Sequence, residues 1–178
     1  MDLSQLILFR DKLRDSFLGN NYNNLLKKLI DDEKDARSKR DSINSHLTKE
    51  RIRVANLFQE DLLKTLSPMG LSNVLFEIQV NSSEPSSKGV DSVQFMFSAN
   101  PGHSLAPLSD IASGGEMSRF LLALKATMNK DKQSSTLLFD EIDSGVSGRA
   151  SSAIASVLKN LSKHQQVFCV THQPLIAA

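Results

Sequence analysis

The sequence predicts an α/β protein preceded by a long helical arm. Three observations indicate this class. Apolar residues recur with helical spacing as far as SPMG at Ser67–Gly70, the spacing then becomes the alternation of a β-hairpin, and two short apolar runs follow that alternate with helical segments. Strands that alternate with helices are typical of a parallel sheet. We therefore expect a helical, partly coiled-coil arm at residues 1–70 and an α/β domain at residues 71–178.

The predicted arm contains a heptad repeat in which eight of twelve seam positions are apolar. Charges of alternating sign flank the seam, as in DDEKDARSKRD at Asp31–Asp41, and this suits a helix with most of its surface in water. A leaky coiled coil and an ordinary amphipathic helix packed on a globular body both explain the pattern. A shorter helix precedes the repeat, and GNNYN at Gly19–Asn23 predicts a break between the two. The seam positions are Tyr22, Leu26, Leu29, Glu33, Ala36, Arg40, Ile43, Leu47, Glu50, Val54, Leu57 and Asp61.

The elements after the arm follow from the same reasoning. Alternating residues predict strands at Val74–Val80 and Val93–Ala99, with the polar segment NSSEPSSKG between them as a hairpin loop. The segment NPGHSLAPLSD is expected to be loop. Beyond it we expect a helix from Ser113 to about Asn129, the buried strand TLLFD, the helix GRASSAIASVLKNL and the buried strand QVFCVT.

The composition indicates where in the cell the protein is expected more clearly than it indicates the function. A net charge of +1 lacks the strong basic excess that would by itself indicate nucleic-acid binding. Cys169 is the single cysteine, so no internal disulfide is expected, and the first residues do not resemble a signal peptide. No uncharged apolar run reaches the roughly 18 residues of a transmembrane helix. We expect a cytoplasmic protein with no membrane partner.

A serine and two glycines stand where the helix after the hairpin begins. A helix start presents unpaired N–H groups and the positive end of the helix dipole, and glycines let an anionic oxygen approach the backbone closely. Ser113, Gly114 and Gly115 therefore form a candidate anion site. The same segment fits a capping box, in which Ser113 and Glu116 satisfy the helix start without a ligand. Both interpretations remain open at this point.

Two adjacent carboxylates, Asp140 and Glu141, follow the apolar run TLLF. Open α/β sheets bind ligands at the carboxyl ends of their strands, and acids buried there are costly unless they are used. A nucleotide site needs one acid near the magnesium ion and one that acts as base toward the attacking water. The alternative is a solvated acidic turn after an edge strand.

The last predicted strand, QVFCVT, is followed by His172. If this strand neighbours TLLFD in the sheet, His172 lies on the same rim as Asp140 and Glu141. A single histidine in a turn is usually only a surface residue, so its importance depends on these neighbours.

Taken in order, SGGEMSR, LLFDE and VTH resemble the C-terminal lobe of an ABC-type ATPase head, which has a P-loop NTPase-like parallel sheet. The fuller segments PLSDIASGGEMSRFLLALK, LLFDEIDSGVSGRA and QVFCVTHQPLIAA resemble the RecN family of bacterial DNA-repair proteins, relatives of the SMC proteins. The resemblance covers roughly Leu47–Ala178. It implies that the heptad region is the helix that runs back along a coiled-coil arm toward the head.

The resemblance also implies roles for single residues, with ATP and Mg²⁺ as cofactors. Asp140 would bind magnesium through water, Glu141 would be the catalytic base, and His172 would be the switch histidine that senses the γ-phosphate. Ser113, Gly114 and Gly115 would be the signature motif that seats the γ-phosphate of an ATP held by a second head. The candidate nucleotide-contacting residues are then Ser113, Gly114, Gly115, Glu116, and the residues of a loop that would cross the dimer interface, Asp143, Ser144 and Gly145.

The chain departs from this family because it contains no phosphate-binding G-x-x-x-x-G-K-S/T sequence. We therefore expect a fragment that cannot hydrolyse ATP alone and that needs the N-terminal P-loop lobe of the same protein. The resemblance implies a homodimer through ATP-bound heads, double-strand break ends of DNA as partner, and a cytoplasmic, nucleoid-associated location. Two alternatives remain: a non-enzymatic dimerisation or DNA-tethering module, and the head of another SMC-class ATPase.

Overall fold

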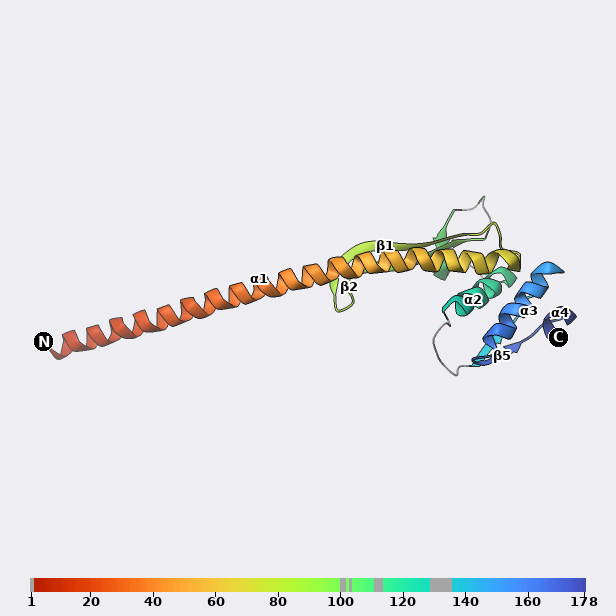
Figure 1. Cartoon of the computed structure of the whole chain (residues 1–178). Helices are drawn as coiled ribbons and strands as arrows, with labels where there is room; N and C mark the ends of the chain where they lie inside the picture. Colours follow the sequence, from red (N-terminus) through yellow and green to blue (C-terminus); the bar gives the residue numbers. More distant parts are fainter. Residues whose placement is uncertain (1, 100–101, 103, 111–113, 129–135) are drawn as a thin grey trace. The chain divides into compact units, whose positions relative to one another are not determined.

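The computed structural model describes the chain except for residues 1, 100–101, 103, 111–113 and 129–135 (Figure 1). The chain forms two compact units, Met1–Leu47 and Thr48–Ala178. A boundary near residue 70 stays a prediction. The elements in chain order are α1 (Leu3–Leu66), the 3₁₀ helix η1 (Ser67–Met69), β1 (Leu75–Ser86), β2 (Gly89–Ser98), β3 (Ala106–Pro107), the 3₁₀ helix η2 (Leu108–Asp110), α2 (Gly115–Met128), β4 (Thr136–Phe139), α3 (Arg149–Leu161), β5 (Gln166–Cys169) and α4 (Pro174–Ala177).

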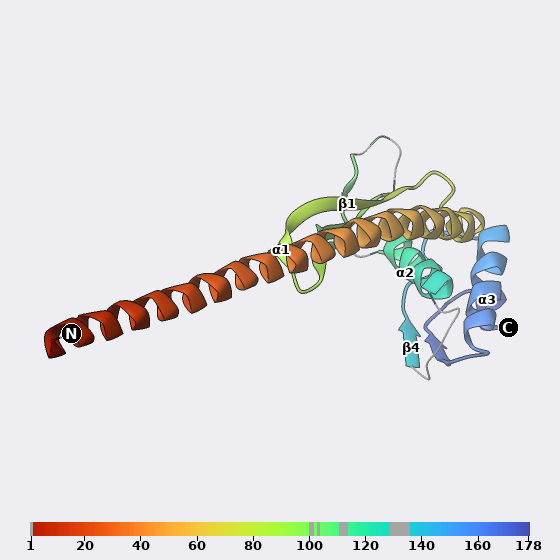
Figure 2. The ribbon, with the colours of Figure 1, turned by 60° about the vertical axis from the view of Figure 1, so that its left-hand side comes forward.

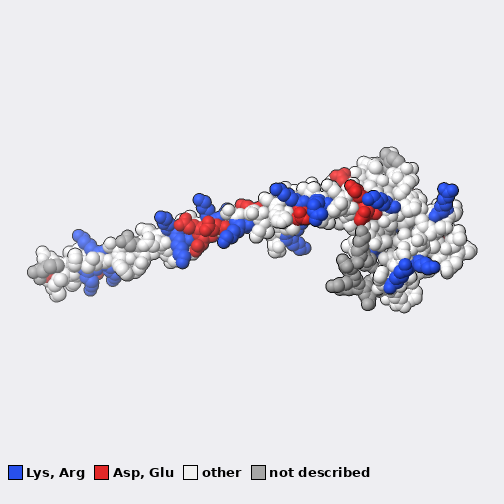
Figure 3. All heavy atoms as spheres, viewed as in Figure 1, with Lys and Arg blue, Asp and Glu red and all other residues white. Residues whose placement is uncertain are grey.

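Helix α1 is continuous, so the predicted break at Gly19–Asn23 is wrong. Glycine costs a helix interior only about 1 kcal/mol relative to alanine and asparagine less, and the long helical segments on both sides propagate through them. In the first unit the side chains of α1 are mostly exposed, and acidic and basic groups alternate along it (Figure 3). The seam residues Tyr22 and Ile43 are 66% and 67% exposed.

The end of α1 lies where the sequence predicts it. Pro68 stands at the start of η1, and Gly70 follows with a left-handed φ of 83°. The Leu71 N–H donates to the Leu66 carbonyl and closes the last turn. A proline that cannot continue the helix and a glycine that accepts positive φ explain this stop.

Strands β1 and β2 form an antiparallel hairpin in which Phe76 pairs with Phe97 and Ile78 with Phe95. The hairpin is longer than predicted, because most of the segment expected to be loop at 81–89 is strand, with a register shift between Ser82 and Ser86. The sequence does not show this because the extension is polar and exposed on both faces. Short strand β3 and helix η2 likewise occupy part of the predicted loop at 100–110.

Strands β4 and β5 are parallel, as predicted, with Phe139 opposite Cys169. The prediction that both strands are buried is wrong for one face of this sheet: Leu138 is 70% exposed and Phe168, its register partner, is 51% exposed. Phe139 on the other face is buried in the core. This pair of strands therefore has one covered and one uncovered apolar face within the described residues.

The core of the second unit joins the end of α1, the hairpin, α2 and α3. Phe120 of α2 lies between the hairpin residues Phe76 and Phe97, with ring centroids 5.4 and 4.7 Å away. Helix α3 contacts α2, η1, β5 and α4. Figure 2 shows α3 beside α2. This packing places the starts of α2 and α3 and the ends of β4 and β5 in one fixed body. None of the helices in the described residues is both long and apolar enough to cross a membrane.

Candidate functional site

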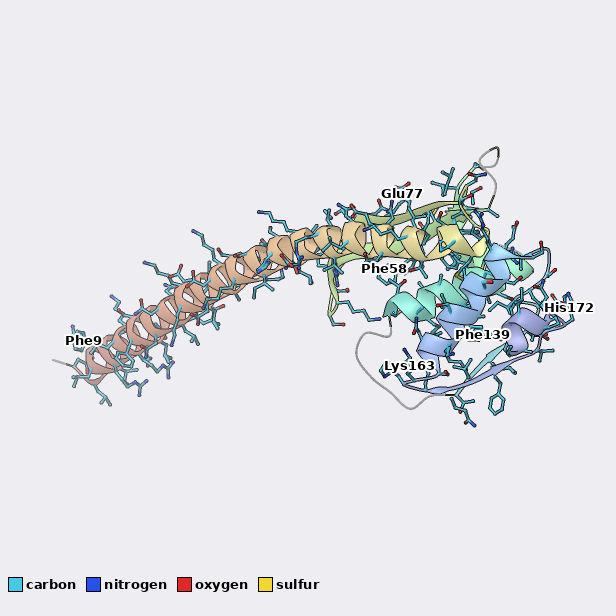
Figure 4. The ribbon with its side chains drawn as sticks, turned by 45° about the vertical axis from the view of Figure 1, so that its right-hand side comes forward. Phe9, Phe58, Glu77, Phe139, Lys163 and His172 are labelled. Atoms are coloured by element: carbon cyan, nitrogen blue, oxygen red, sulfur yellow. The ribbon has the colours of Figure 1, made fainter. Side chains whose placement is uncertain are left out.

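A pocket of about 330 Å³ lies at the carboxyl ends of β4 and β5. Asp140 directly follows β4 and His172 follows β5 after a short segment, so the parallel pairing brings them to one rim (Figure 4, where Phe139 and His172 are labelled). The sequence predicts this arrangement if the two strands are neighbours, and the structure pairs them. The pocket is lined by Asp140, Glu141, Asp143, Ser144, Val170, Thr171 and His172.

Glu141 has the left-handed backbone conformation, with φ of 55°, and is the one residue other than glycine with positive φ in the described part of the chain. This conformation costs a non-glycine residue about 1–2 kcal/mol. It is held from both sides, because the Glu141 N–H donates to Asp140 Oδ1 at 2.9 Å and the Ser144 N–H donates to the Glu141 carbonyl at 3.1 Å. Both carboxylates remain exposed. Residues with such backbone strain cluster at functional sites.

Asp143 is the buried acid of the pocket, with a side chain only 3% exposed. It accepts a hydrogen bond from the Thr171 hydroxyl at 2.5 Å and another from the His172 N–H at 2.9 Å. Burial alone would raise the pKa of Asp143, but these hydrogen bonds outweigh it and hold the pKa below its ordinary value. The carboxylate is therefore engaged inside the chain, whereas the family resemblance places this residue at a dimer interface.

The imidazole of His172 is 77% exposed, and its contact with Asp143 orients it. Its Nδ1 lies 3.1 Å from Asp143 Oδ2. Because Asp143 holds both the backbone N–H and Nδ1, the side chain is presented to solvent with Nε2 outside this contact. A ring nitrogen held in this way fixes the orientation of the other one.

The start of α2 lies next to the loop after β4 but does not line the pocket. Ser113 lies outside the described residues, so neither its capping nor its anion-binding role is visible. Gly114 accepts a hydrogen bond from the Ser118 N–H, and a Cβ added to Gly115 would lie 2.7 Å from Ser144 Cβ. Glu116 is exposed in the first turn.

Gly145 completes the candidate set. It is exposed and has φ of 71°, and a Cβ added to it would meet nothing within 4 Å. The residue is therefore required for the turn itself, since positive φ favours glycine. It leaves the backbone of this loop accessible from outside.

Sequence reasoning missed Arg119, which is 4% exposed and donates to the Ser144 carbonyl at 2.6 Å. Burial lowers its pKa. A charge on the apolar stripe of a predicted helix, next to Phe120, was a usable signal. Gln173 was also missed: its Nε2 donates to the carbonyls of Asp143 at 3.2 Å and of Val146 at 2.5 Å. No local pattern marks a glutamine that directly precedes a short helix.

The donor set fits a magnesium ion only together with a nucleotide. Among the described residues no group of three or more His, Cys, Asp and Glu side chains lies close enough to hold a metal. Magnesium in nucleotide sites is bound by one or two carboxylates, several waters and the phosphates. The exposed Asp140 carboxylate matches that partial role and does not form a resident metal site.

Comparisons with known proteins show which proteins the chain is similar to. No protein-family model matches the chain. It is 51% identical over 133 residues to the DNA repair protein RecN of Synechocystis sp., covering 74% of this chain and 23% of that protein. The RecN proteins of Deinococcus radiodurans and Rickettsia conorii are 38% and 41% identical over 161 and 133 residues, which are 84% and 75% of this chain and 28% and 24% of theirs. The chain is RecN-like. It spans about a quarter of the length of these RecN relatives.

A solved structure shows the fold class of this RecN-like chain. A Pyrococcus furiosus Smc head domain with an extended coiled coil, bound to the C-terminal domain of ScpA, matches with a TM-score of 0.58 and 17% identity. The match covers 98% of this chain and 44% of the Smc chain. The predicted α/β head fold with a helical arm is thereby confirmed.

Proposed function

We propose that this RecN-like chain supplies the signature segment, the two acids after β4 and the switch histidine to a composite ATP site, in a protein that repairs DNA double-strand breaks. One observation carries the proposal. The pocket at the ends of the parallel strands β4 and β5 gathers Asp140, Glu141 and His172, with Glu141 held in a left-handed backbone. The RecN relatives and the Smc head fold support it.

Each residue of the pocket has a separate role that follows from its position. The exposed Glu141 carboxylate takes a proton from the water that attacks the γ-phosphate, and His172 contacts that phosphate with the nitrogen that Asp143 leaves free. Asp140 would hold magnesium through water, and the bound ion would supply positive charge that offsets the charge of the phosphates. The accessible backbone at Ser144 and Gly145 faces the second head across the nucleotide.

The uncovered apolar face of the β4–β5 sheet favours completion by another lobe. Leu138, Phe168 and Val170 are 70%, 51% and 57% exposed on this face, beside the pocket. Apolar strands of parallel sheets are normally covered on both faces. The chain also contains no P-loop sequence. We infer that the P-loop lobe of the same protein covers this face and brings the phosphates to Asp140.

The start of α2 then serves a second subunit. Gly114 and Gly115 do not line the pocket of their own chain, so a phosphate seated there belongs to an ATP held elsewhere. This supports a homodimer of ATP-bound heads. The further parts of the proposal, DNA ends as partner and a location on the nucleoid in the cytoplasm, rest on the RecN relatives.

Glu141→Gln in the full-length protein tests the proposal. The variant keeps the shape of the side chain and removes the base, so ATP binding should persist while turnover falls about 10²–10⁴-fold. Asp140→Asn is the matched variant on the neighbouring residue, and it should weaken magnesium-dependent nucleotide binding. Turnover within about threefold of the wild type in Glu141→Gln, with ATP binding unchanged, would show that Glu141 is not the base.

A further inference from the structure

The carboxamide of Gln173 joins three segments that meet behind the candidate site. Its Nε2 donates to the carbonyls of Asp143 and Val146, on the loop after β4. Its Oε1 accepts from the hydroxyl of Ser151, which is fully buried in the first turn of α3. Two carbonyls accept only and a hydroxyl is able to donate, so this orientation of the amide is the one that satisfies every group.

The segment held by Gln173 is the one that carries His172. The Gln173 N–H donates to Thr171 Oγ1 at 3.1 Å, and the Thr171 hydroxyl donates to Asp143. Asp143 also accepts from the His172 N–H. Residues 171–173 are therefore fixed to the loop after β4 at both ends, by the Asp143 carboxylate on one side and by the Gln173 carboxamide on the other.

We propose that Gln173 is a positioning residue, which holds the His172 segment against the loop that carries Glu141 so that both face one phosphate. The inference rests on the proposed ATP site and adds to it a residue to which no role follows from the signature, acidic or histidine motifs. The physical reason is geometric: the imidazole is mostly exposed and has one contact of its own, at Asp143, so its place in space depends on the backbone that bears it.

Ser151 extends the arrangement to α3. Helix α3 packs on η1. Gly70 directly follows η1, and a Cβ added to it would lie 3.5 Å from Val146 and 3.6 Å from Ala150 of α3. The same carboxamide that holds residues 171–173 thus holds Val146 and the start of α3. A displacement of α3 would be passed directly to the His172 segment.

Amide hydrogen exchange on the 178-residue chain tests the positioning without ATP. The His172 N–H donates to Asp143, and the Val170 N–H donates to the Phe139 carbonyl and serves as the internal reference. Gln173→Leu keeps the volume and removes the hydrogen bonds, each of which changes an equilibrium by about two- to tenfold. We expect exchange at His172 to rise about tenfold or more while Val170 is unaffected.

Two further variants make this result specific. Ser151→Ala removes one of the three bonds of the carboxamide and should loosen His172 less than Gln173→Leu does. Gln166→Leu makes the same chemical change at the other end of β5, and should leave His172 unchanged. Unchanged exchange at His172 in Gln173→Leu, or equal rises at His172 and Val170, would overturn the proposal, because the first excludes positioning and the second indicates a general loss of stability.

ATP turnover of the full-length protein gives the second readout. Gln173→Leu should lower kcat with little change in KM, and adding Gln173→Leu to His172→Ala should cause no further loss, because Gln173 acts through His172. Additive losses would overturn the proposal. If His172→Ala alone leaves turnover unchanged, the proposed role of His172 fails, and the exchange experiment still decides whether Gln173 fixes its segment.

Discussion

The close approach of α2 to the loop after β4 leaves no room for a side chain at Gly115. A Cβ built there would lie 2.7 Å from Ser144 Cβ, 3.0 Å from the Ser144 carbonyl oxygen and 3.1 Å from Arg119 Nη1. Two of these three atoms belong to the loop next to Asp143, and Arg119 is itself buried. The loop or the helix must therefore move when Gly115 is replaced. The φ of Gly115 is not positive, so backbone strain is not expected in a variant. The prediction therefore rests on the steric contact alone.

We expect Gly115→Ser to destabilise the fold by about 1–3 kcal/mol, the usual cost of adding atoms to a packed site. For a protein of this size that lowers the melting temperature by about 2–4 °C per kcal/mol. The matched control is Gly114→Ser, since a Cβ added to Gly114 meets nothing within 4 Å. Serine is also a favourable residue before a helix, so the control should stay within about 0.5 kcal/mol of the wild type.

Urea unfolding followed by circular dichroism measures both variants under the same conditions. Equal stability of Gly115→Ser and Gly114→Ser would show that this prediction is wrong, because only the side chain at residue 115 would meet the atoms of Ser144 and Arg119. A destabilised Gly115→Ser beside an unchanged control would show that this glycine is required by packing, independently of any role in binding phosphate.

Two further predictions concern Asp143 and Ser113. The lowered pKa of Asp143 stabilises the fold above the ordinary carboxyl pKa of about 3.9, and this contribution is lost as the pH falls through the lowered value in the folded state. Asp143→Asn should therefore lose stability relative to the wild type at pH 6, and the difference should shrink below about pH 4 in urea titrations; a difference independent of pH would contradict this. Ser113→Arg should leave the fold intact, with a capping loss of about 0.5–2 kcal/mol, yet abolish ATP-dependent head dimers in sedimentation of the full-length protein with a Glu141→Gln background. Dimers that form as in the parent would make Ser113 a helix cap only.

Local patterns predict the elements that carry the site. The apolar runs before Asp140 and His172 give two strands, and their parallel pairing brings both residues to one rim. The same patterns predict a stop at Ser67–Gly70, because a proline and a glycine act there through the backbone itself. Periodicity also separates the arm from the hairpin.

The errors arise where tertiary context outweighs local preference. Gly19–Asn23 is helical because the cost of its residues is small beside the helix on each side. The polar end of the hairpin is held by a contact far away in sequence: Asp91 accepts from Thr48 and from Arg51 of α1. The hydrogen bonds from Arg51 and Thr48 also lower the pKa of Asp91.

The parts of the site that the sequence does not reveal are its long-range hydrogen bonds. The hydrogen bonds of the Gln173 carboxamide join residues 22 to 30 positions apart, and Arg119 reaches Ser144 across 25 positions. No spacing rule predicts such pairs. The left-handed backbone of Glu141 is likewise a result of the loop fold and not of its residue type, which disfavours it.

If this chain supplies part of an ATP site whose phosphate-binding part lies elsewhere in the protein, only the complete protein hydrolyses ATP. Magnesium-dependent ATP turnover should therefore be measured for three purified proteins: this chain, the full-length protein, and the full-length protein with Glu141→Gln. We expect turnover by the full-length protein, its loss in Glu141→Gln, and none by the chain alone, because nothing positions the phosphates. Turnover by the chain alone, above that of its own Glu141→Gln variant, would mean that the chain holds a phosphate site of its own and that the proposed division of the ATP site is wrong.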